Sequence, residues 1–542
     1  MEYDAVVIGA GHNGLIAAVR LAEAGWSVLV LEQARRPGGA VLSEELTLPG
    51  FTHDVFSTNQ NLLLGSQFYA EHASALAQHG LRYAVGSRPY ANAFPDGTAL
   101  GVEQDPDRTL NGLAERDSGD ADGWLRLQRL YDRYSSTLFG LYSAPAPSMA
   151  MASATARAAL RLRPAGFARL VQLLLSSTRE LGDTFFATPE AKAMVACWGM
   201  HLDFGPDVAG GAMFPFLELF TDQRQGMSIV EGGASGLIAA LAGLLHQHGG
   251  ELRTEAAVRR IITSGGTARQ VELADGQRIT ARRAIIAGTT PTALFGELLD
   301  RAPAGVRRDA ARFTYGPGTM MVHLALDGPV PWRAGPALAG HAYVHIGPYV
   351  EDLARTYTAA LNGLLPRDPT LVCAQTSVVD PTRAPAGKHV LWIQVRALPP
   401  RIRGDDAGEL TATNWDEAAE PYAERVLDRL ETYAPGLRQR ILGRAVLSPI
   451  DLQRRNPNLV GGDSIAGSMH LRQNFAFRPF PGMSRYKTPI RHLYLIGAST
   501  WPGGGVNGLS GDHVARHLTR RTRQRRGAEQ LPPSNLRPGR GS

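Results

Sequence analysis

The sequence predicts an α/β protein in which a Rossmann-type dinucleotide-binding domain accompanies a second domain of the α+β class. Residues 3–32 contain an apolar strand, a glycine turn, a helix and a second apolar strand at the spacing of one strand–helix–strand unit. A second glycine-rich segment follows an apolar strand near the other end of the chain. The length of 542 residues exceeds one ordinary hydrophobic core, so two domains are expected.

The first strand and its glycine turn begin the dinucleotide-binding unit. Tyr3–Ile8 is β-branched and apolar, as expected of a buried strand, and Gly9, Gly11 and Gly14 follow it. These glycines allow the backbone to turn sharply and to approach a pyrophosphate at the N-terminus of the next helix. Because such a glycine pattern also arises by chance, the flanking strand and helix carry the prediction.

The second strand, Ser27–Leu31, ends in an acidic residue. Glu32 stands eighteen residues after Gly14, where a carboxylate binds ribose hydroxyls and repels a 2′-phosphate. Arg36, Gly38 and Gly39 follow at once. This segment favours FAD over NAD, because an extended FAD needs close backbone approach beyond the first turn. An ordinary charged turn is the alternative interpretation.

The matching signal lies near the carboxyl end of the chain. His492–Ile496 reads as an apolar strand, and a glycine-rich segment, residues 497–508, leads into a predicted helix. The N-terminus of such a helix carries about half a positive charge and would stabilise negative charge on a reduced flavin. The two ends of the chain are therefore expected to share one cofactor.

Several separated motifs occur together and in order. They are AGHNGL at 10–15, PGFTHD at 49–54, DPTRAP at 380–385, GGDSIAG at 461–467 and PGGGVNG at 502–508. With these motifs the chain resembles the FAD-dependent phytoene-desaturase-like family, within the broader amine-oxidase type of flavoprotein fold. The resemblance covers nearly the whole chain. It is strongest to the branch of pyridine nucleotide-disulfide oxidoreductase domain-containing protein two and bacterial phytoene-dehydrogenase-like proteins.

The resemblance implies FAD as the cofactor, and it implies roles for further residues. Residues 231–237 match the family's GGxxxL segment, and Val258 would contact the adenine through its backbone. Trp501 stands where the family often has histidine, which removes an ionisable group beside the flavin ring. The residues predicted to bind the cofactor are Gly9, Gly11, His12, Asn13, Gly14, Glu32, Gln33, Arg36, Gly38, Gly39, Val258, Gly497, Gly504, Gly505 and Val506.

The alternation of predicted strands and helices divides the chain into discontinuous domains. We assign residues 1–70, 228–300 and 440–518 to the FAD-binding domain, and residues 71–227 and 301–439 to an α+β substrate domain. Strands predicted at Thr319–Leu326, Leu371–Val379 and His389–Val395 would form an antiparallel sheet over the flavin. Residues 519–542 are predicted to be a basic, disordered tail.

The leading functional hypothesis is a dehydrogenase or desaturase. A flavin accepts hydride at N5 while a proton leaves the neighbouring carbon, which converts a single carbon–carbon bond into a double bond. The resemblance implies a small hydrophobic, isoprenoid- or polyene-like substrate. Three alternatives stay open: ketolase-type oxygenation, flavin-dependent saturation or isomerisation, and a flavin-binding interaction protein without catalysis.

No residue identifies the catalytic base from sequence. His53 and Asp54 follow the segment Arg36–Gly39 and are weak candidates, and the alternative is a hydrogen-bonded structural pair. Seven aromatic residues are candidates to line an apolar tunnel, although such residues more often form a core. These are Phe185, Phe186, Trp198, Phe204, Phe214, Phe216 and Phe220.

The net charge of +6 comes entirely from the predicted tail, where residues 519–542 hold seven arginines and one glutamate. The remaining chain is formally neutral, so no specific nucleic-acid binding is expected. Peripheral membrane contact is a separate hypothesis. It depends on Met149–Leu181, where basic residues precede a leucine-rich run. The alternative is a helix of the substrate domain that packs its leucines inward.

The remaining composition excludes several classes of protein. Cys197 and Cys373 are far apart, so neither a disulfide framework nor a thiol redox centre is expected. His341 and His345 lack a third ligand in an alternating strand pattern, so no metal is expected. With the first strand starting near residue 3, we expect no N-terminal leader and a cytoplasmic protein, either free or peripheral to the inner face of a membrane. The oligomeric state is left open.

Overall fold

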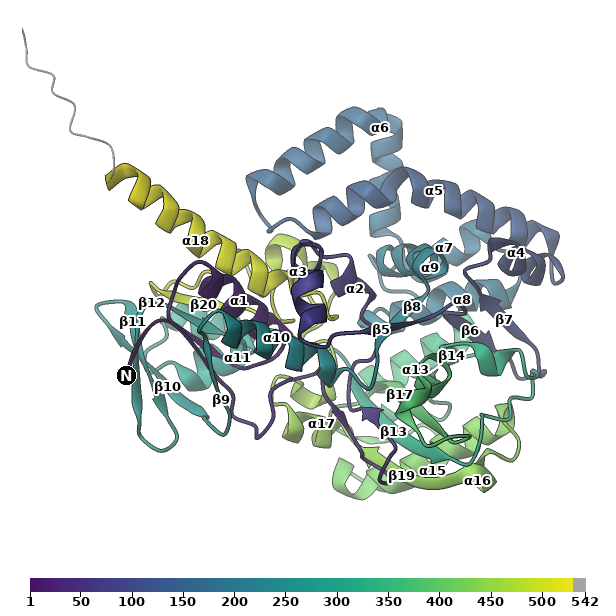
Figure 1. Cartoon of the computed structure of the whole chain (residues 1–542). Helices are drawn as coiled ribbons and strands as arrows, with labels where there is room; N and C mark the ends of the chain where they lie inside the picture. The colour runs from purple at the N-terminus through teal and green to yellow at the C-terminus, as the bar shows by residue number, and fades with distance from the viewer. Residues whose placement is uncertain (530–542) are drawn as a thin grey trace, which may run out of the picture.

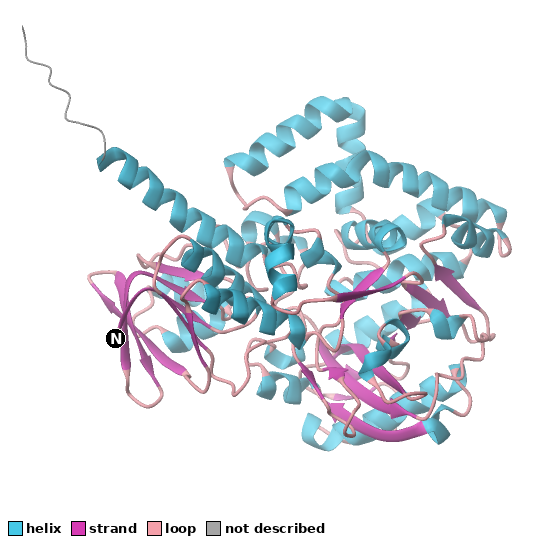
Figure 2. Ribbon diagram, viewed as in Figure 1, coloured by secondary structure: helices cyan, strands magenta, loops and turns pink. Residues whose placement is uncertain are grey.

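The computed structural model describes residues 1–529. Two seven-stranded sheets lie side by side, with helices packed around both (Figures 1 and 2). One sheet is largely parallel and the other largely antiparallel. This arrangement confirms the predicted α/β class with a Rossmann-type sheet.

The first sheet has a parallel core with an antiparallel hairpin at one side. Its strand order is β10-β11-β12-β1-β2-β9, and β20 pairs with the carboxyl half of β12. Ile8 pairs with Leu31 on one side and with Ala287 on the other, so three strands end at one edge. The strands are β1 (Glu2–Ile8), β2 (Val28–Leu31), β9 (Glu251–Arg253), β10 (Val258–Ser264), β11 (Thr267–Leu273), β12 (Arg278–Ala287) and β20 (Leu493–Leu495).

The apolar side chains of β1 are buried on both faces of this sheet. Ala5 and Val7 pack into a core with the helices α1 (His12–Glu23), α10 (Ser235–Gln247) and α18 (Leu509–Glu529). Val6 and Ile8 point to the opposite core, which contains residues of the β10–β11 hairpin. Since successive side chains of a strand alternate between faces, a continuous apolar run is what a doubly covered strand requires.

The second sheet has the order β19-β13-β17-β16-β14-β6-β7, in which only β6 and β14 pair in parallel. One face is covered by the helices α4 to α9 and the other by α15 (Trp415–Tyr433). The strands are β6 (Tyr90–Ala93), β7 (Ala99–Val102), β13 (Gly318–Leu326), β14 (Tyr343–Ile346), β16 (Thr370–Ala374), β17 (His389–Leu398) and β19 (Ile441–Leu447). The helices are α4 (Pro106–Ala114), α5 (Ser118–Tyr142), α6 (Met149–Leu175), α7 (Thr178–Phe185), α8 (Pro189–Gly199) and α9 (Met213–Gln225).

Three two-stranded pairs and eight further α-helices complete the described fold. The two-stranded pairs are β3 (Ser43–Glu44) with β4 (His53–Asp54), β5 (Tyr83–Gly86) with β8 (Met227–Val230), and β15 (Leu364–Leu365) with β18 (Gly404–Asp405). The other α-helices are α2 (Asn61–Leu64), α3 (Gln67–Gln78), α11 (Pro291–Ala293), α12 (Ala304–Ala311), α13 (Val350–Leu361), α14 (Thr376–Val379), α16 (Leu437–Arg440) and α17 (Pro449–Arg455). Within residues 1–529, no helix is both long and apolar enough to cross a lipid bilayer.

The structure corrects three sequence predictions. The boundary at residue 440 is misplaced, because β19 (Ile441–Leu447) pairs with β13 and belongs to the second sheet. The predicted strand Leu371–Val379 ends at Ala374, and residues 376–379 form a helical turn. Residues 519–529 continue α18, since arginine and glutamine are good helix formers that extend a helix already anchored in the core. Residues 530–542 of the predicted tail lie outside the described part of the chain.

Candidate functional site

A cavity of about 430 Å³ joins the carboxyl edge of the parallel sheet to the inner face of the second sheet. At one end it is lined by the turn after β1, by the end of β2 and by Gly288 after β12. At the other end it is lined by side chains of β13, β14, β17, α8 and α9. A volume of this size is typical of sites for small molecules and cofactors.

Most residues predicted to bind the cofactor meet at this cavity. The exceptions are Gly38 and Gly504, which do not line it. A Cβ atom on Gly38 would lie 2.6 Å from the Val41 carbonyl oxygen, so this glycine permits the backbone to fold tightly behind the cavity wall. The predicted residues that line the cavity are Gly9, Gly11, His12, Asn13, Gly14, Glu32, Gln33, Arg36, Gly39, Val258, Gly497, Gly505 and Val506.

The N-terminus of α1 fits a pyrophosphate. A Cβ atom on Gly14 would lie 2.2 Å from the Gly9 carbonyl oxygen, so only glycine lets α1 lie this close to the turn after β1. No side chain of the described residues caps the helix at Gly11, which leaves its first backbone N–H groups available. Free N–H groups and the positive end of a helix dipole form a phosphate site.

Glu32 is fixed at the edge of the cavity by two backbone groups. One carboxylate oxygen accepts the N–H of Ala10 at 2.8 Å, and the other accepts the N–H of Ala34 at 2.9 Å. Each carboxylate oxygen can accept more than one hydrogen bond. Glu32 therefore keeps acceptor capacity at the cavity edge, and its binding of ribose hydroxyls stays a prediction.

Trp501 does not face the cavity. Its indole N–H donates to the Ala144 carbonyl oxygen at 2.8 Å, and its ring stacks on Phe475 at 4.9 Å between centroids. The side chain is 1% exposed. The expectation that position 501 lies beside the flavin ring is therefore wrong: Trp501 is a core residue, and Gly505 and Val506 line the cavity instead.

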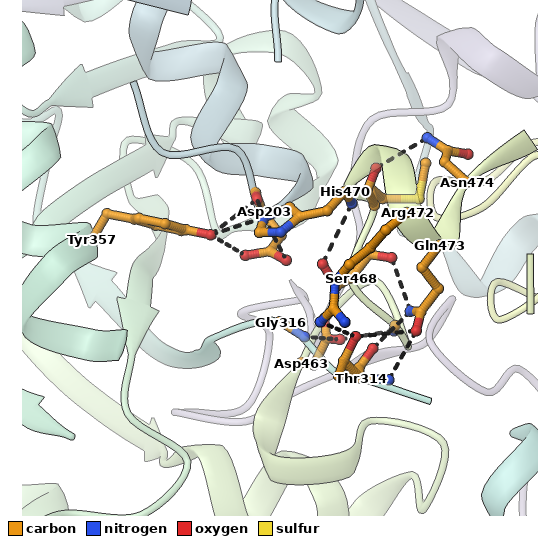
Figure 3. A network of polar contacts seen from close by, with 12 residues as sticks. Asp203, Thr314, Gly316, Tyr357, Asp463, Ser468, His470, Arg472, Gln473 and Asn474 are labelled. Atoms are coloured by element: carbon orange, nitrogen blue, oxygen red, sulfur yellow. Dashed lines mark hydrogen bonds and ion pairs between the residues drawn. The ribbon is translucent and has the colours of Figure 1, made fainter. Parts of the chain in front are cut away.

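The GGDSIAG motif shapes the loop that closes one side of the cavity (Figure 3). Asp463 is buried, and its carboxylate accepts the backbone N–H groups of Gly316, Ile465 and Gly467 at 2.7 to 3.0 Å. Burial raises the pKa of Asp463, and these three hydrogen bonds oppose that rise. The following residues, 464–466, line the cavity.

A second contact ties the same loop to the helical layer (Figure 3). The Tyr357 hydroxyl donates to Asp203 Oδ1 at 2.9 Å, and His470 Nε2 lies 2.8 Å from the Asp203 carbonyl oxygen. Arg478 is fully buried and donates to the carbonyl oxygens of Ser468 and Ala498, at 2.7 Å each. This network holds the loop against Ala498, which lines the cavity.

Three other motifs meet at one buried guanidinium group. Arg383 forms ion pairs with Asp54 at 2.8 Å and with Asp380 at 3.1 Å, and all three side chains are at most 2% exposed. Asp54 also accepts the N–H of Ala234, and Asp380 accepts that of Gly232. Ion pairs and hydrogen bonds therefore hold the segments 49–54, 231–237 and 380–385 together beside the cavity. None of these segments lines the cavity end formed by β13, β14, β17, α8 and α9.

The placement of His53 and Asp54 favours the structural alternative. Neither residue lines the cavity. His53 Nε2 lies 2.8 Å from the Thr47 hydroxyl, its ring packs against His323, and burial lowers the pKa of His53 to about 4. A neutral histidine behind the cavity wall is not placed to take a proton from a substrate.

The far end of the cavity is mainly aromatic and aliphatic. Trp198, Phe214, Met321, Tyr343 and Trp392 line it. Trp198 and Phe214 were candidates for an apolar tunnel from sequence. The other candidates pack elsewhere: Phe186, Phe216 and Phe220 belong to the main core of the helical layer, Phe185 packs against that core, and Phe204 lies in a small separate cluster.

Sequence reasoning missed several polar residues at this end. Trp392, Gln394 and Arg396 alternate along β17, so all three point to the same face, which lines the cavity. Burial lowers the pKa of Arg396 to about 10, and its guanidinium donates to the carbonyl oxygens of Met200 and His201. Alternation within the predicted strand His389–Val395 was the available signal for Trp392 and Gln394, whereas Arg396 lies one residue beyond that strand.

Glu218 on α9 is the other residue that the sequence did not reveal. It lines the cavity, its side chain is buried, and burial raises the pKa of Glu218 to about 7. Nothing in the helical pattern of residues 213–225 distinguishes it from an ordinary surface glutamate. Within residues 1–529, histidine, cysteine, aspartate and glutamate form no group of three or more suited to a metal ion.

Comparison with known proteins identifies the family of this chain. The family model described as flavin containing amine oxidoreductase matches residues 14–519. Pyridine nucleotide-disulfide oxidoreductase domain-containing protein 2 of Rattus norvegicus is 30% identical, over 96% of this chain and 94% of its own length. The neurosporene-forming phytoene desaturase of Cereibacter sphaeroides is 26% identical, over 97% of this chain and 96% of its own length.

A solved structure shows the same fold. An oxidoreductase from Methanosarcina mazei superimposes with a TM-score of 0.61 at 17% identity, covering 95% of this chain and all of that one. The chain is thus similar to flavoproteins in both sequence and fold, and its glycine turn, helix terminus and Glu32 fit FAD.

Proposed function

Because the chain belongs to the flavin containing amine oxidoreductase family, we propose that it is an FAD-dependent dehydrogenase that forms carbon–carbon double bonds in a hydrophobic, isoprenoid- or polyene-like substrate. The observation that supports this substrate class is the aromatic and aliphatic lining of the cavity end opposite the dinucleotide-binding residues. Apolar substrates are bound there by removal of their surface from water.

FAD bound at this site supplies two-electron oxidation by accepting a hydride. The chain itself supplies position and exclusion of water. Trp198 and Trp392 offer flat apolar surfaces for a conjugated chain, and the Asp463 network holds the adjoining loop. The fixed Arg396 guanidinium presents positive charge at the same end.

The test is anaerobic flavin absorbance of the purified protein with its FAD. Linear polyenes and shorter isoprenoids are added in mixed micelles, and NADH and NADPH are added separately. We expect a polyene or isoprenoid to bleach the flavin band and to yield a product two hydrogens lighter. Bleaching by a nicotinamide alone would support saturation or isomerisation, and oxygen incorporated into the product would support ketolation; either result would contradict the proposal.

Phe214 provides a variant for the substrate end. We expect Phe214→Asp to slow bleaching by about tenfold or more, because a carboxylate in an apolar cavity costs binding free energy on the order of 1.4 kcal/mol or more. FAD content should be unchanged. The matched control is Phe477→Asp, since Phe477 is 52% exposed at the end of a short 3-10 helix and does not line the cavity. Equal rates in the two variants would argue against an apolar substrate at this end.

We further propose that α6 contacts a membrane surface. Met149, Leu160, Val171 and Leu175 are exposed on this helix, with Met149 84% and Leu160 82% exposed. Arg157, Arg161 and Arg169 are exposed beside them. α5 and α6 lie at the outer edge of the helical layer, away from the parallel sheet (Figure 1). α6 consists of two helical segments that meet at a kink at Arg163, and each segment carries exposed apolar and basic residues. Exposed residues of these two kinds together are typical of peripheral membrane contact.

Vesicle flotation tests this contact. The protein is expected to float with vesicles of phosphatidylcholine and an anionic lipid, and Leu160→Glu with Leu175→Glu should abolish flotation while FAD content stays the same. The matched control is Leu361→Glu with Leu442→Glu, which changes two exposed leucines on other elements. Flotation that persists in the α6 variant would exclude this helix as the contact.

A further inference from the structure

Glu218 is a buried acid that has no cationic partner within residues 1–529. It stands on α9, its side chain is 6% exposed, and it lines the substrate end of the cavity. Among the described side chains, none forms a hydrogen bond or ion pair with its carboxyl. Burying an acid without a partner costs free energy, so such a group in a cavity is a candidate for function.

The groups that face Glu218 are phenols and one acid. Glu218 lies close enough to Tyr90, Tyr131, Tyr142 and Tyr343 to act electrostatically on each, although burial is the larger cause that raises the pKa of these phenols. These tyrosines come from β6, α5 and β14. None of them forms an ion pair with Glu218, so the carboxyl stays free to exchange a proton with the cavity.

Asp222 lies one helical turn after Glu218 and is fully buried. Its Oδ1 accepts a hydrogen bond from the Asn61 side-chain amide at 2.8 Å. Burial, with the charge of Glu218 as a second cause, raises the pKa of Asp222 well above its usual value. Asp222 is held by its hydrogen bond with Asn61 and does not line the cavity, so of the two acids Glu218 is the one that faces the cavity.

Tyr142, on which Glu218 acts electrostatically, contacts the glycine-rich segment before α18. The Tyr142 hydroxyl lies 3.4 Å from the Asn507 side-chain amide, and Asn507 directly follows the cavity residue Val506. Glu218 thus stands where the apolar end of the cavity approaches the segment assigned to the flavin ring. This is the place where a proton must leave the substrate as hydride leaves its neighbouring carbon.

The other ionisable groups at this end are not suited to that step. Burial lowers the pKa of His201 well below its usual value, and His201 Nε2 lies 3.1 Å from His345 Nε2. Arg396 is a cation held by backbone carbonyl groups, and Tyr343 is a phenol whose pKa burial raises. The remaining ionisable residues of the lining lie elsewhere. His12, Glu32 and Arg36 lie at the dinucleotide-binding edge, Glu297 lies in the short π-helix after α11, and Arg455 ends α17.

We propose that Glu218 is the catalytic base that takes the proton from the substrate carbon next to the one that loses hydride, an inference that rests on the proposed function. One carbon–hydrogen bond breaks and its electron pair leaves as hydride to FAD, which is the two-electron oxidant. The neighbouring carbon–hydrogen bond breaks, its electron pair forms the new double bond, and the proton passes to the Glu218 carboxylate. Glu218 then releases this proton to water.

The test measures the rate of flavin bleaching against pH in rapid mixing, for the wild type, Glu218→Gln and the surface control Glu115→Gln. Because the base must be ionised, the wild-type rate is expected to rise with pH and to level off above about pH 7. Glu218→Gln is expected to be about a hundredfold slower or more and independent of pH, with normal FAD content. Glu115→Gln is expected to match the wild type.

The outcomes separate this inference from the proposed function. If no polyene or isoprenoid bleaches the wild-type flavin, the function and the base both fail. If bleaching occurs and Glu218→Gln keeps the wild-type rate and pH profile, only the base is overturned. If Glu218→Gln loses FAD, Glu218→Asp is measured, and a pH-independent rate in that variant overturns the inference.

Infrared titration of the resting holoenzyme adds a readout that needs no substrate. A carboxylic-acid carbonyl band is expected to grow as pH falls through about 7 in the wild type, and to be missing from that titration in Glu218→Gln. Asp222 is retained in Glu218→Gln, so a band that titrates in both proteins is not assigned to Glu218. The same titration in both proteins would overturn the assignment of the titrating acid.

Discussion

Gly14→Ala is expected to weaken FAD binding by about ten- to a hundredfold, and the purified variant to be largely colourless. The added Cβ would lie 2.2 Å from the Gly9 carbonyl oxygen and 3.3 Å from a methyl group of Val7. Because both neighbours belong to β1 and its turn, α1 must move away from the sheet. Overpacking of this kind costs roughly 1–3 kcal/mol, which corresponds to such a loss of affinity if the shift falls on the phosphate site.

Gly140→Ala is the matched control for this variant. Gly140 also lies within a helix, α5, and a Cβ there has no neighbour within 4 Å. Replacing glycine by alanine in a helix stabilises it by up to about 1 kcal/mol, so the control should keep its FAD. The measurement is the ratio of flavin to protein absorbance, followed by titration of the apoprotein with FAD. Wild-type affinity in Gly14→Ala would show that the cofactor does not lie against the N-terminus of α1.

The positions of the glycine turn and Glu32 at the cavity could be predicted, because they depend on local sequence. A strand, a glycine turn and a helix occur within one short segment, and the acid that follows lies at a fixed distance in sequence. The pairing of Ile8 with Leu31 and Ala287 then places these residues at one edge. Family resemblance extended the prediction to residues 497–508, almost at the other end of the chain.

Glu218 and Arg396 could not be predicted, because their importance depends on what surrounds them in space. Glu218 occupies an ordinary helical position, and burial in the folded chain raises its pKa, within electrostatic reach of tyrosines on α5, β6 and β14 that are distant in sequence. Trp501 shows the converse case. Its position in a glycine-rich motif indicated contact with the cofactor, but tertiary packing turned the indole toward Ala144.

Motifs with a structural role also could not be interpreted from sequence alone. The segments 49–54 and 380–385 are distinctive in sequence. From sequence alone, an acid in such a segment is as consistent with a catalytic role as with a structural role. Only the structure shows that Asp54 and Asp380 both pair with Arg383, behind the cavity wall. Loss of one charged partner leaves an unpaired charge in the protein interior, so Arg383 and its two acids depend on one another. This dependence accounts for the distinctive segments without a role in the reaction.

Asp54→Asn is therefore expected to lower the free energy of unfolding by about 3 to 5 kcal/mol, the usual cost of removing one partner from a buried ion pair. The asparagine keeps the shape of the side chain, while Arg383, which is fully buried, loses one of its two negative partners. Urea unfolding followed by far-ultraviolet circular dichroism measures this change. The control is Asp183→Asn, whose ion pair with Lys192 is at the surface and should contribute less than about 1 kcal/mol.

The flavin-bleaching rate of Asp54→Asn distinguishes a structural role from a catalytic one. If Asp54 only holds Arg383, the folded, FAD-containing fraction of the variant should bleach at the wild-type rate within about twofold, with the wild-type pH profile, because Asp54 does not line the cavity. A catalytic base would show the opposite pattern, with a large loss of rate and little loss of stability. Stability lost with the rate retained would place Asp54 in the scaffold, and a rate lost in a stable protein would return it to the list of candidate bases.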